Sequence, residues 1–154
     1  KKIDFLSAPA SLATEVSKTD TLTAANPGIY AVNALVNLGY NFCPKLQAGF
    51  NIDLLGFSFG PEGSPVFKAN GSQTTTKAKP TGFNVLLIGD NDRGTLNSEF
   101  YLRYKVNKKV GIKAAYEYLF TELTTNTKVQ TAPEQNDRFR NKASLFSVGV
   151  SYHF

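Results

Sequence analysis

Apolar and polar residues alternate with a period of two along much of the chain. From Ile29 to Phe42 the sequence reads IYAVNALVNLGYNF, where every second position from Tyr30 onward is apolar and three of the six positions between are asparagine. Because successive side chains of a β-strand point to opposite faces, this pattern predicts a strand at 30–42 with one apolar and one polar face.

The same alternation returns in four later segments. It predicts strands at about 45–55, 98–107, 110–121 and 142–154. A first strand is expected at about 3–15, where small residues and Pro9 leave the two faces ambiguous. Lengths of about nine to thirteen residues exceed the five or six common in globular proteins, and a tilted strand of about nine to eleven residues crosses a bilayer. The pattern therefore predicts an all-β chain of long amphipathic strands.

The segment between residues 57 and 97 interrupts this pattern. The sequence TGFNVLLIGD alternates and predicts one more strand, but its candidate partner at about 65–76, PVFKANGSQTTT, is polar on both faces. Two architectures stay open. The favoured one is an antiparallel up-and-down transmembrane β-barrel of eight strands, because about eight is the smallest usual closed bacterial barrel. The alternative is six membrane strands plus an external hairpin.

Alternation alone fits both a membrane barrel and a soluble, lipocalin-like barrel, since either has one apolar and one polar face. Three features favour the membrane barrel, with lipid on the outside. They are the length of the strands, the aromatic residues near the ends of the apolar faces, and the alternation of short and long connections. The aromatic positions are Tyr30, Tyr40, Phe42, Tyr104, Tyr118, Phe120, Tyr152 and Phe154. Outer-membrane barrels have short periplasmic turns, so the short connections NFCPK and VNKKV predict a periplasmic C-terminus.

The polar face carries charges of both signs on neighbouring predicted strands. Buried charges persist only when they are paired and hydrogen-bonded, and an eight-stranded interior is just wide enough for side chains to fill it. We therefore expect an interior charge network that plugs the centre and leaves no open channel. Its members are Asp53, Glu99, Arg103, Lys105, Lys113 and Glu117.

Composition excludes several other classes of protein. The 154 residues suit a single domain, 1–154, and the net charge of +5 comes from scattered Lys and Arg, so no nucleic-acid partner is expected. Cys43 is the only cysteine, which excludes an intramolecular disulfide and argues against a zinc cluster. No apolar run is long enough for a transmembrane helix. The start, KKIDF, has no n-region or h-region, so we expect any export signal to have been removed.

Candidate chemistry along the chain is sparse. The only histidine, His153, is predicted at the periplasmic end, away from the outer rim where a hydrolase of this type would need a Ser–His pair. The sequence GDNDRGT, with Asp90, Asn91 and Asp92, has the composition of a calcium loop but not the spacing of an EF-hand, so a turn is the better interpretation. We expect no catalytic residues, no metal site and no cofactor.

The last eight residues, SVGVSYHF, resemble the C-terminal assembly signal of Gram-negative outer-membrane barrels. That signal has a polar residue, Gly two places later, then an aromatic or apolar residue and a terminal aromatic; Ser147, Gly149, Tyr152 and Phe154 occupy these positions. The whole chain resembles small barrels of the OmpA/OmpX type, with amide-rich and Tyr-rich strands similar to those of Bacteroidota. The resemblance implies residence in the bacterial outer membrane and recognition of the terminal strand by the barrel-assembly machinery, which pairs with its edge.

The function we expect from these observations is non-enzymatic. The chain would be a structural or interaction component that contacts outer-membrane lipids and docks with other outer-membrane proteins in a larger assembly. The main alternative is a small pore or passive transporter. A membrane-embedded hydrolase and a soluble ligand-binding barrel are the remaining hypotheses, and the second of these would need no detergent for extraction.

Overall fold

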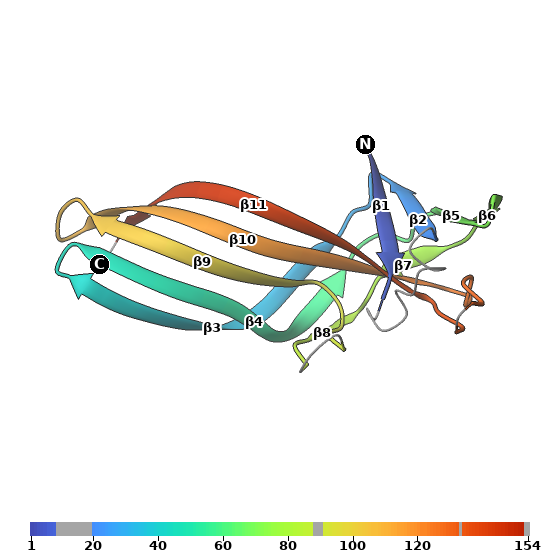
Figure 1. Cartoon of the computed structure of the whole chain (residues 1–154), viewed down its shortest axis with the longest axis horizontal. Coiled ribbons are helices and arrows are strands. Elements are labelled where there is room, and N and C mark those ends of the chain that lie inside the picture. Colours follow the sequence, from blue (N-terminus) through green and yellow to red (C-terminus); the bar gives the residue numbers. More distant parts are fainter. Residues whose placement is uncertain (9–19, 88–90, 133, 153–154) are drawn as a thin grey trace.

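The computed structural model describes residues 1–8, 20–87, 91–132 and 134–152. The described residues form an all-β, antiparallel structure of eleven strands (Figure 1). Five strands are long: β3 (Tyr30–Cys43), β4 (Leu46–Phe59), β9 (Leu96–Lys105), β10 (Val110–Thr125) and β11 (Arg138–Tyr152). They confirm the five strands that the alternating pattern predicts most clearly. In the described ranges no helix is long and apolar enough to span a membrane.

Six strands are short and gather at the end of the molecule away from the β3–β4 and β9–β10 turns (Figure 1). They are β1 (Lys2–Ser7), β2 (Thr21–Ala25), β5 (Val66–Ala69), β6 (Ser72–Thr75), β7 (Ala78–Pro80) and β8 (Phe83–Val85). We call this end of the molecule the head, and the end that carries the two tight turns the hairpin end.

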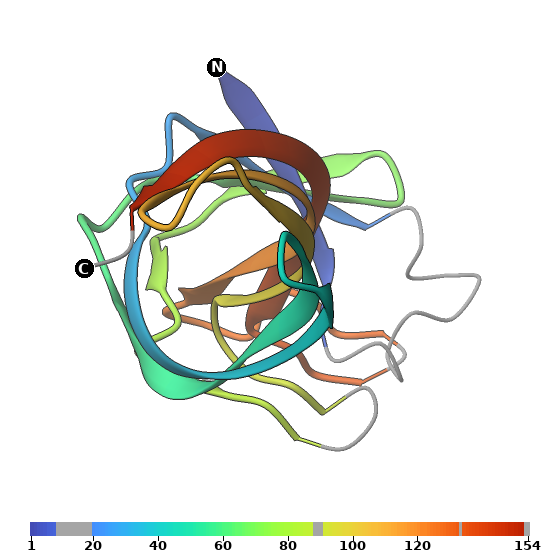
Figure 2. The same cartoon turned by 90° about the vertical axis from the view of Figure 1, so that its left-hand side faces the viewer.

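The strands are ordered β3-β4-β9-β10-β11-β1-β2-β5-β6, with β7 against β10 and β8 against β4. Seen end-on, the long strands curl around a central axis (Figure 2). The sheet is not closed into a barrel, because the described residues of β3 and β11, its outermost long strands, are not paired with each other. The antiparallel fold is therefore as predicted, whereas the described strands do not complete the predicted barrel.

Two of the other predicted strands are described differently. Of the first, expected at 3–15, the described part is β1, Lys2–Ser7, and residues 9–15 of the prediction lie outside the described residues. The segment 65–76 is not one strand but the hairpin β5–β6, in which Val66 pairs with Thr75 and Ala69 with Ser72. Its turn, Asn70-Gly71, has positive φ at both residues, which is the backbone of a tight two-residue hairpin loop.

The strand predicted from TGFNVLLIGD is also shorter than expected, since β8 covers only Phe83–Val85. Its neighbour β4 is longer than predicted because a bulge corrects its phase. Ala34 pairs with Leu55 but Leu35 pairs with Asp53, so Leu54 is an extra residue. Because of the bulge, the apolar residues before and after Leu54 in β4 lie on the same face of the sheet.

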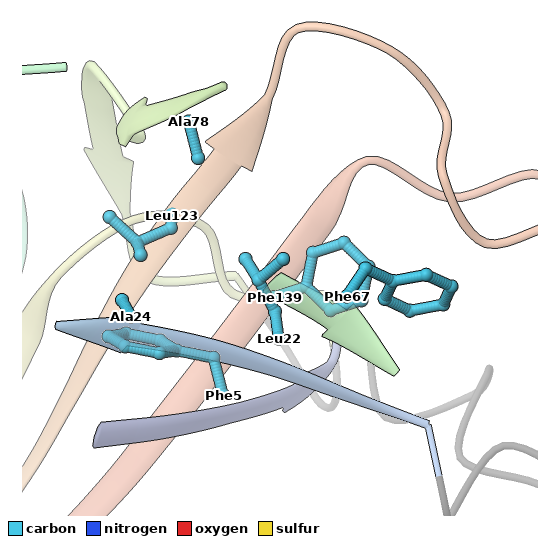
Figure 3. Close-up of a cluster of buried hydrophobic side chains, with 7 residues drawn as sticks. All are labelled: Phe5, Leu22, Ala24, Phe67, Ala78, Leu123 and Phe139. Atoms are coloured by element: carbon cyan, nitrogen blue, oxygen red, sulfur yellow. The ribbon is translucent and has the colours of Figure 1, made fainter. Parts of the chain in front are cut away.

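The buried hydrophobic core lies in the head and not between the long strands (Figure 3). It is formed by Phe5, Leu22, Ala24, Phe67, Ala78, Leu123 and Phe139. Leu123 and Phe139 come from the head ends of β10 and β11, where they are paired with each other. The short strands therefore cover one face of the sheet at this end, as in an ordinary water-soluble β-structure.

The two faces of the β10–β11 pair exchange their polarity along the strands. Toward the hairpin end one face shows the exposed pairs Ile112–Val150 and Tyr116–Phe146. β10 and β11 continue into the head without a register shift, and there the same face carries the pair Glu122–Arg140. The opposite face changes from charged residues to the core residues named above. The change falls at the pair Phe120–Lys142, which we call the boundary.

Candidate functional site

The polar face of the long strands is the candidate site, and Tyr101 on β9 lies at its centre. Tyr101 is 1% exposed although it lies on the polar face of the strand. Its ring covers Gly49 of β4, where an added Cβ would lie 2.2 Å from the ring and hydroxyl atoms. Its hydroxyl donates to Oδ1 of Asn37 on β3 at 3.2 Å. The side chain thus crosses the whole width of β4, which requires the polar face to be concave.

Two cations lie against the faces of this tyrosine ring. The Nζ of Lys113 is 4.9 Å from the ring centroid and the guanidinium carbon of Arg103 is 5.1 Å from it. Lys113 also donates to both carboxylate oxygens of Glu99, at 2.6 and 2.7 Å. Cation–π contacts strengthen when the cation is desolvated, so the partial burial of the Lys113–Glu99 pair favours this arrangement.

Amides extend the cluster toward β4. Asn51 donates to Oε1 of Glu99 at 2.6 Å, and Arg103 donates to Oε1 of Gln47 at 3.0 Å. The Nε of Arg103 is buried without a hydrogen-bond partner in the part of the chain that the structure describes. We define the interior cluster as Gln47, Asn51, Glu99, Tyr101, Arg103 and Lys113. It fills the concave face with side chains from three neighbouring strands.

The remaining members of the predicted charge network lie in separate contacts. Asp53 accepts from Nδ2 of Asn33 at 2.7 Å and from the backbone N–H of Asn97 at 2.9 Å, nearer the head. Glu117 accepts from the Ser147 hydroxyl at 2.6 Å. The side chain of Lys105 makes no ion pair with any described residue. The structure therefore brings Glu99, Arg103 and Lys113 together and holds Asp53 and Glu117 apart from them.

The predicted assembly signal is described for three of its four residues. Ser147 binds Glu117 as above, an added Cβ at Gly149 would meet nothing within 4 Å, and Tyr152 is 55% exposed. Phe154 and the histidine at 153 lie outside the described residues. In the GDNDRGT segment, Asp92 accepts from the backbone N–H of Leu87 at 2.8 Å, and Gly89 and Asp90 lie outside the described residues.

The role of Tyr101 is the feature that the sequence analysis missed. The register aligns Tyr101 with Gly49 and Gly49 with Gly39, so one aromatic residue faces two glycines on neighbouring strands. An aromatic ring that covers a cross-strand glycine restores the packing that the glycine lacks. The sequence contains a signal for this contact. Tyr101 occupies a polar-face position of its predicted strand, and Gly39 and Gly49 occupy polar-face positions of the two strands before it.

A second ionic cluster lies in the head, on the opposite face. Glu122 is fully buried and accepts from Arg138 Nε at 2.8 Å and from Arg140 at 2.8 Å. Both arginines also donate to the backbone carbonyl of Asp92, and the Arg140 guanidinium lies 4.4 Å from the centroid of the Phe120 ring. This cluster fixes the segment around Asp92 against β10 and β11 immediately beyond the boundary.

Neither cluster has the composition of a metal centre. Within the described ranges, no three His, Cys, Asp or Glu side chains are grouped so that they could hold a metal ion. The contacts of the interior cluster pair charges and fill space on the concave face. A scan against protein-family models found no match, and searches of curated proteins and of solved structures found none either.

Replacement of Gly49 by alanine is expected to destabilise the protein by about 1–3 kcal/mol, because the new methyl group overlaps the Tyr101 ring. The free energy of unfolding, measured by urea titration with circular dichroism in detergent, checks this. Gly149→Ala is the matched control and should change it by no more than about 0.5 kcal/mol, since the site is open. In a Tyr101→Ala background the cost of Gly49→Ala should largely disappear; an undiminished cost there would contradict the proposed contact.

Proposed function

We propose that this chain is a non-enzymatic component of a bacterial outer membrane, whose five long strands cross the bilayer with their apolar face in lipid. The observation that carries this proposal is the exchange of polarity at the boundary. On the hairpin side of Phe120–Lys142 the β10–β11 pair has its apolar residues outside, and on the head side it has them inside. A continuous pair of strands needs two opposite patterns only if its two ends meet different solvents.

The extent of the outward apolar face supports the same proposal. Phe146, Val148 and Val150 on β11 are 87%, 80% and 79% exposed, and the neighbouring long strands add further aromatic and aliphatic side chains. Soluble monomers rarely expose contiguous apolar patches of more than a few hundred Å². A face of this kind that runs across five adjacent strands needs a cover, and lipid chains supply one without a specific partner.

The location and orientation rest on the terminal strand. The resemblance of residues 147–154 to an outer-membrane assembly signal favours insertion by the barrel-assembly machinery, with the hairpin end and the C-terminus on the periplasmic side. The head, with its own hydrophobic core, would then stand on the outer side of the membrane. A structural or docking role suits this arrangement, because the head offers a folded surface outside the bilayer.

A tryptophan placed on the outward face is expected to be quenched by brominated lipids. The chain contains no Trp, so Phe100→Trp on β9, where the native ring is 53% exposed, gives a single reporter. Thr74→Trp, in the exposed β6 strand of the head, is the matched control. In brominated-lipid vesicles the emission at 100 should fall several-fold more than that at 74. Equal quenching at the two positions would contradict a lipid-facing β9.

The interior cluster favours a plugged structure over the alternative of a small pore. Potassium efflux from liposomes that contain the protein is expected to equal that from empty liposomes. Tyr101→Ala should raise the efflux, because it removes the ring that spans β4 and holds both cations, whereas Tyr104→Ala on the outward face should leave it unchanged. Rapid efflux through the wild-type protein would instead support the pore.

A further inference from the structure

The hairpin end carries four lysines in and beside its two turns (Figure 1). Lys45 lies in the turn between β3 and β4, Lys105 is the last residue of β9, and Lys108 and Lys109 lie in the connection between β9 and β10. We call these four residues the basic rim. In the part of the chain that the structure describes, none of them forms an ion pair.

Acidic residues are missing from the described segments that surround the basic rim. No Asp or Glu occurs in residues 30–52, 100–116 or 138–152. Glu99, six residues before Lys105, lies about 20 Å away along the strand and is already bound by Lys113. In the head, by contrast, acidic and basic side chains are mixed, as in the pair of Lys77 and Glu62. The positive charge of the hairpin end therefore has no counterpart among the described residues.

The two turns are joined and internally ordered. The backbone N–H of Lys105 donates to the backbone carbonyl of Lys45 at 2.7 Å. Oδ1 of Asn107 accepts from the backbone N–H groups of Lys109 and Val110 at 2.8 and 2.9 Å. A cavity of about 400 Å³ lies between the turns, lined by Pro44, Lys45, Lys105, Val106, Asn107 and Lys108. Three lysines thus surround one cavity on a backbone that hydrogen bonds hold in place.

The cavity lies on the β4–β9 side of the hairpin end. Tyr152, the last described residue of β11, pairs with Val110 on the other side of β10. Because the strands are ordered β4-β9-β10-β11, β10 separates β11 from the β4–β9 pair whose turns form the cavity.

The basic rim directly follows the aromatic end of the outward apolar face. Tyr40 and Phe42 on β3 are exposed and lie edge to face, with ring centroids 5.2 Å apart, and the exposed Tyr104 precedes Lys105 on β9. Aromatic side chains of membrane proteins concentrate where hydrocarbon meets the headgroups. Under the proposed function, on which this inference rests, the basic rim therefore lies at the depth of the lipid headgroups.

We propose that the basic rim binds the phosphate groups of anionic phospholipids in the leaflet at the hairpin end. These headgroups supply the negative charge that the described chain lacks there, and each lysine close to a membrane surface strengthens the attraction about fivefold. Zwitterionic lipids reach the same depth but carry no net charge. An acidic protein would match the charge, but anionic headgroups already lie beside the lipid-facing strands and need no additional folded surface.

Quenching of one tryptophan by brominated lipids tests this preference. Tyr104→Trp places the only tryptophan of the chain on the outward face beside the basic rim. The protein is reconstituted into vesicles of phosphatidylglycerol and phosphatidylcholine, with bromine first on one lipid and then on the other. Phosphatidylglycerol is expected to associate about fivefold or more strongly than phosphatidylcholine. Because the attraction is electrostatic, salt at about 1 M should bring the two lipids close to equal.

Two charge variants, both made with Trp at position 104, locate the preference. Lys45→Gln, Lys105→Gln, Lys108→Gln and Lys109→Gln together keep the turns polar and should abolish it. The matched control removes the same charge from the head, with Lys1→Gln, Lys2→Gln, Lys77→Gln and Lys79→Gln, and should retain the preference. Quenching by brominated phosphatidylcholine shows whether each variant is inserted.

Every other outcome contradicts a specific part of the proposal. Equal quenching by the two lipids at low salt, with all lysines present, would exclude headgroup binding and leave the membrane location standing. A preference that survives the variant of the basic rim, or that is lost equally in the head variant, would show that these four lysines do not cause it. Absence of quenching by either lipid would overturn the proposed membrane location itself.

Discussion

Leu102→Lys is expected to destabilise the protein in lipid vesicles by about 2–4 kcal/mol, the cost of a lysine near the bilayer midplane on the outward face of a barrel. Leu102 is 46% exposed and is flanked across the sheet by Ala48 on β4 and Ala114 on β10. These small neighbours offer the ammonium group neither a partner nor a route to water. The free energy of unfolding in urea, measured in vesicles, checks the value.

The matched control is the same substitution in the head. Thr74→Lys on β6 is exposed and should change the free energy of unfolding by no more than about 0.5 kcal/mol, as surface substitutions usually do. If Leu102→Lys also costs no more than this, the outward face meets water, and the exchange of polarity at the boundary needs another explanation. The difference between the two variants, rather than either value alone, is what the membrane proposal predicts.

Glu122→Gln is expected to lower the stability of the head by about 3–5 kcal/mol, because removal of one partner leaves uncompensated buried charge. The fully buried Glu122 holds Arg138 and Arg140 together, and Arg140 is itself 7% exposed. The amide keeps the size of the side chain but removes the negative charge that both guanidinium groups require. Thermal unfolding followed by circular dichroism measures the effect.

An exposed ion pair in the same region gives the comparison. Lys77 and Glu62 lie 3.9 Å apart with side chains that are 60% and 45% exposed. Surface pairs of this kind contribute about 0–1 kcal/mol, so Glu62→Gln should barely change the melting temperature. Equal effects of the two substitutions would mean that the Glu122 cluster is hydrated in solution, contrary to its burial in the structure.

The five long strands could be predicted because period-two alternation directly reflects how side chains leave a strand. The turn at Asn70-Gly71 was also encoded in the sequence, since this dipeptide is a strong hairpin signal, and it divides the single strand predicted at 65–76 into β5 and β6. The phase change at Leu54 had a comparable signal in two adjacent leucines. A strand that keeps one face apolar through such a pair requires a bulge.

The interior cluster could be predicted only in part. The sequence places Glu99, Arg103 and Lys113 on the polar face, but which charges meet depends on the register and curvature of the sheet. Tyr101 shows the limit most clearly. Its contact with Asn37 crosses an intervening strand, and no pattern within either strand specifies that distance.

The sequence by itself determined that this protein is built from long antiparallel strands with one apolar and one polar face, because alternation is a local property of the chain. The tertiary structure alone decided where those faces exchange their polarity, which charges are paired, and that β3 and β11 are not paired with each other among the described residues. These features depend on the pairing of residues far apart in sequence. A period-two pattern is the same in either register of a strand and whether its apolar face meets lipid or a protein core. It therefore cannot specify these features.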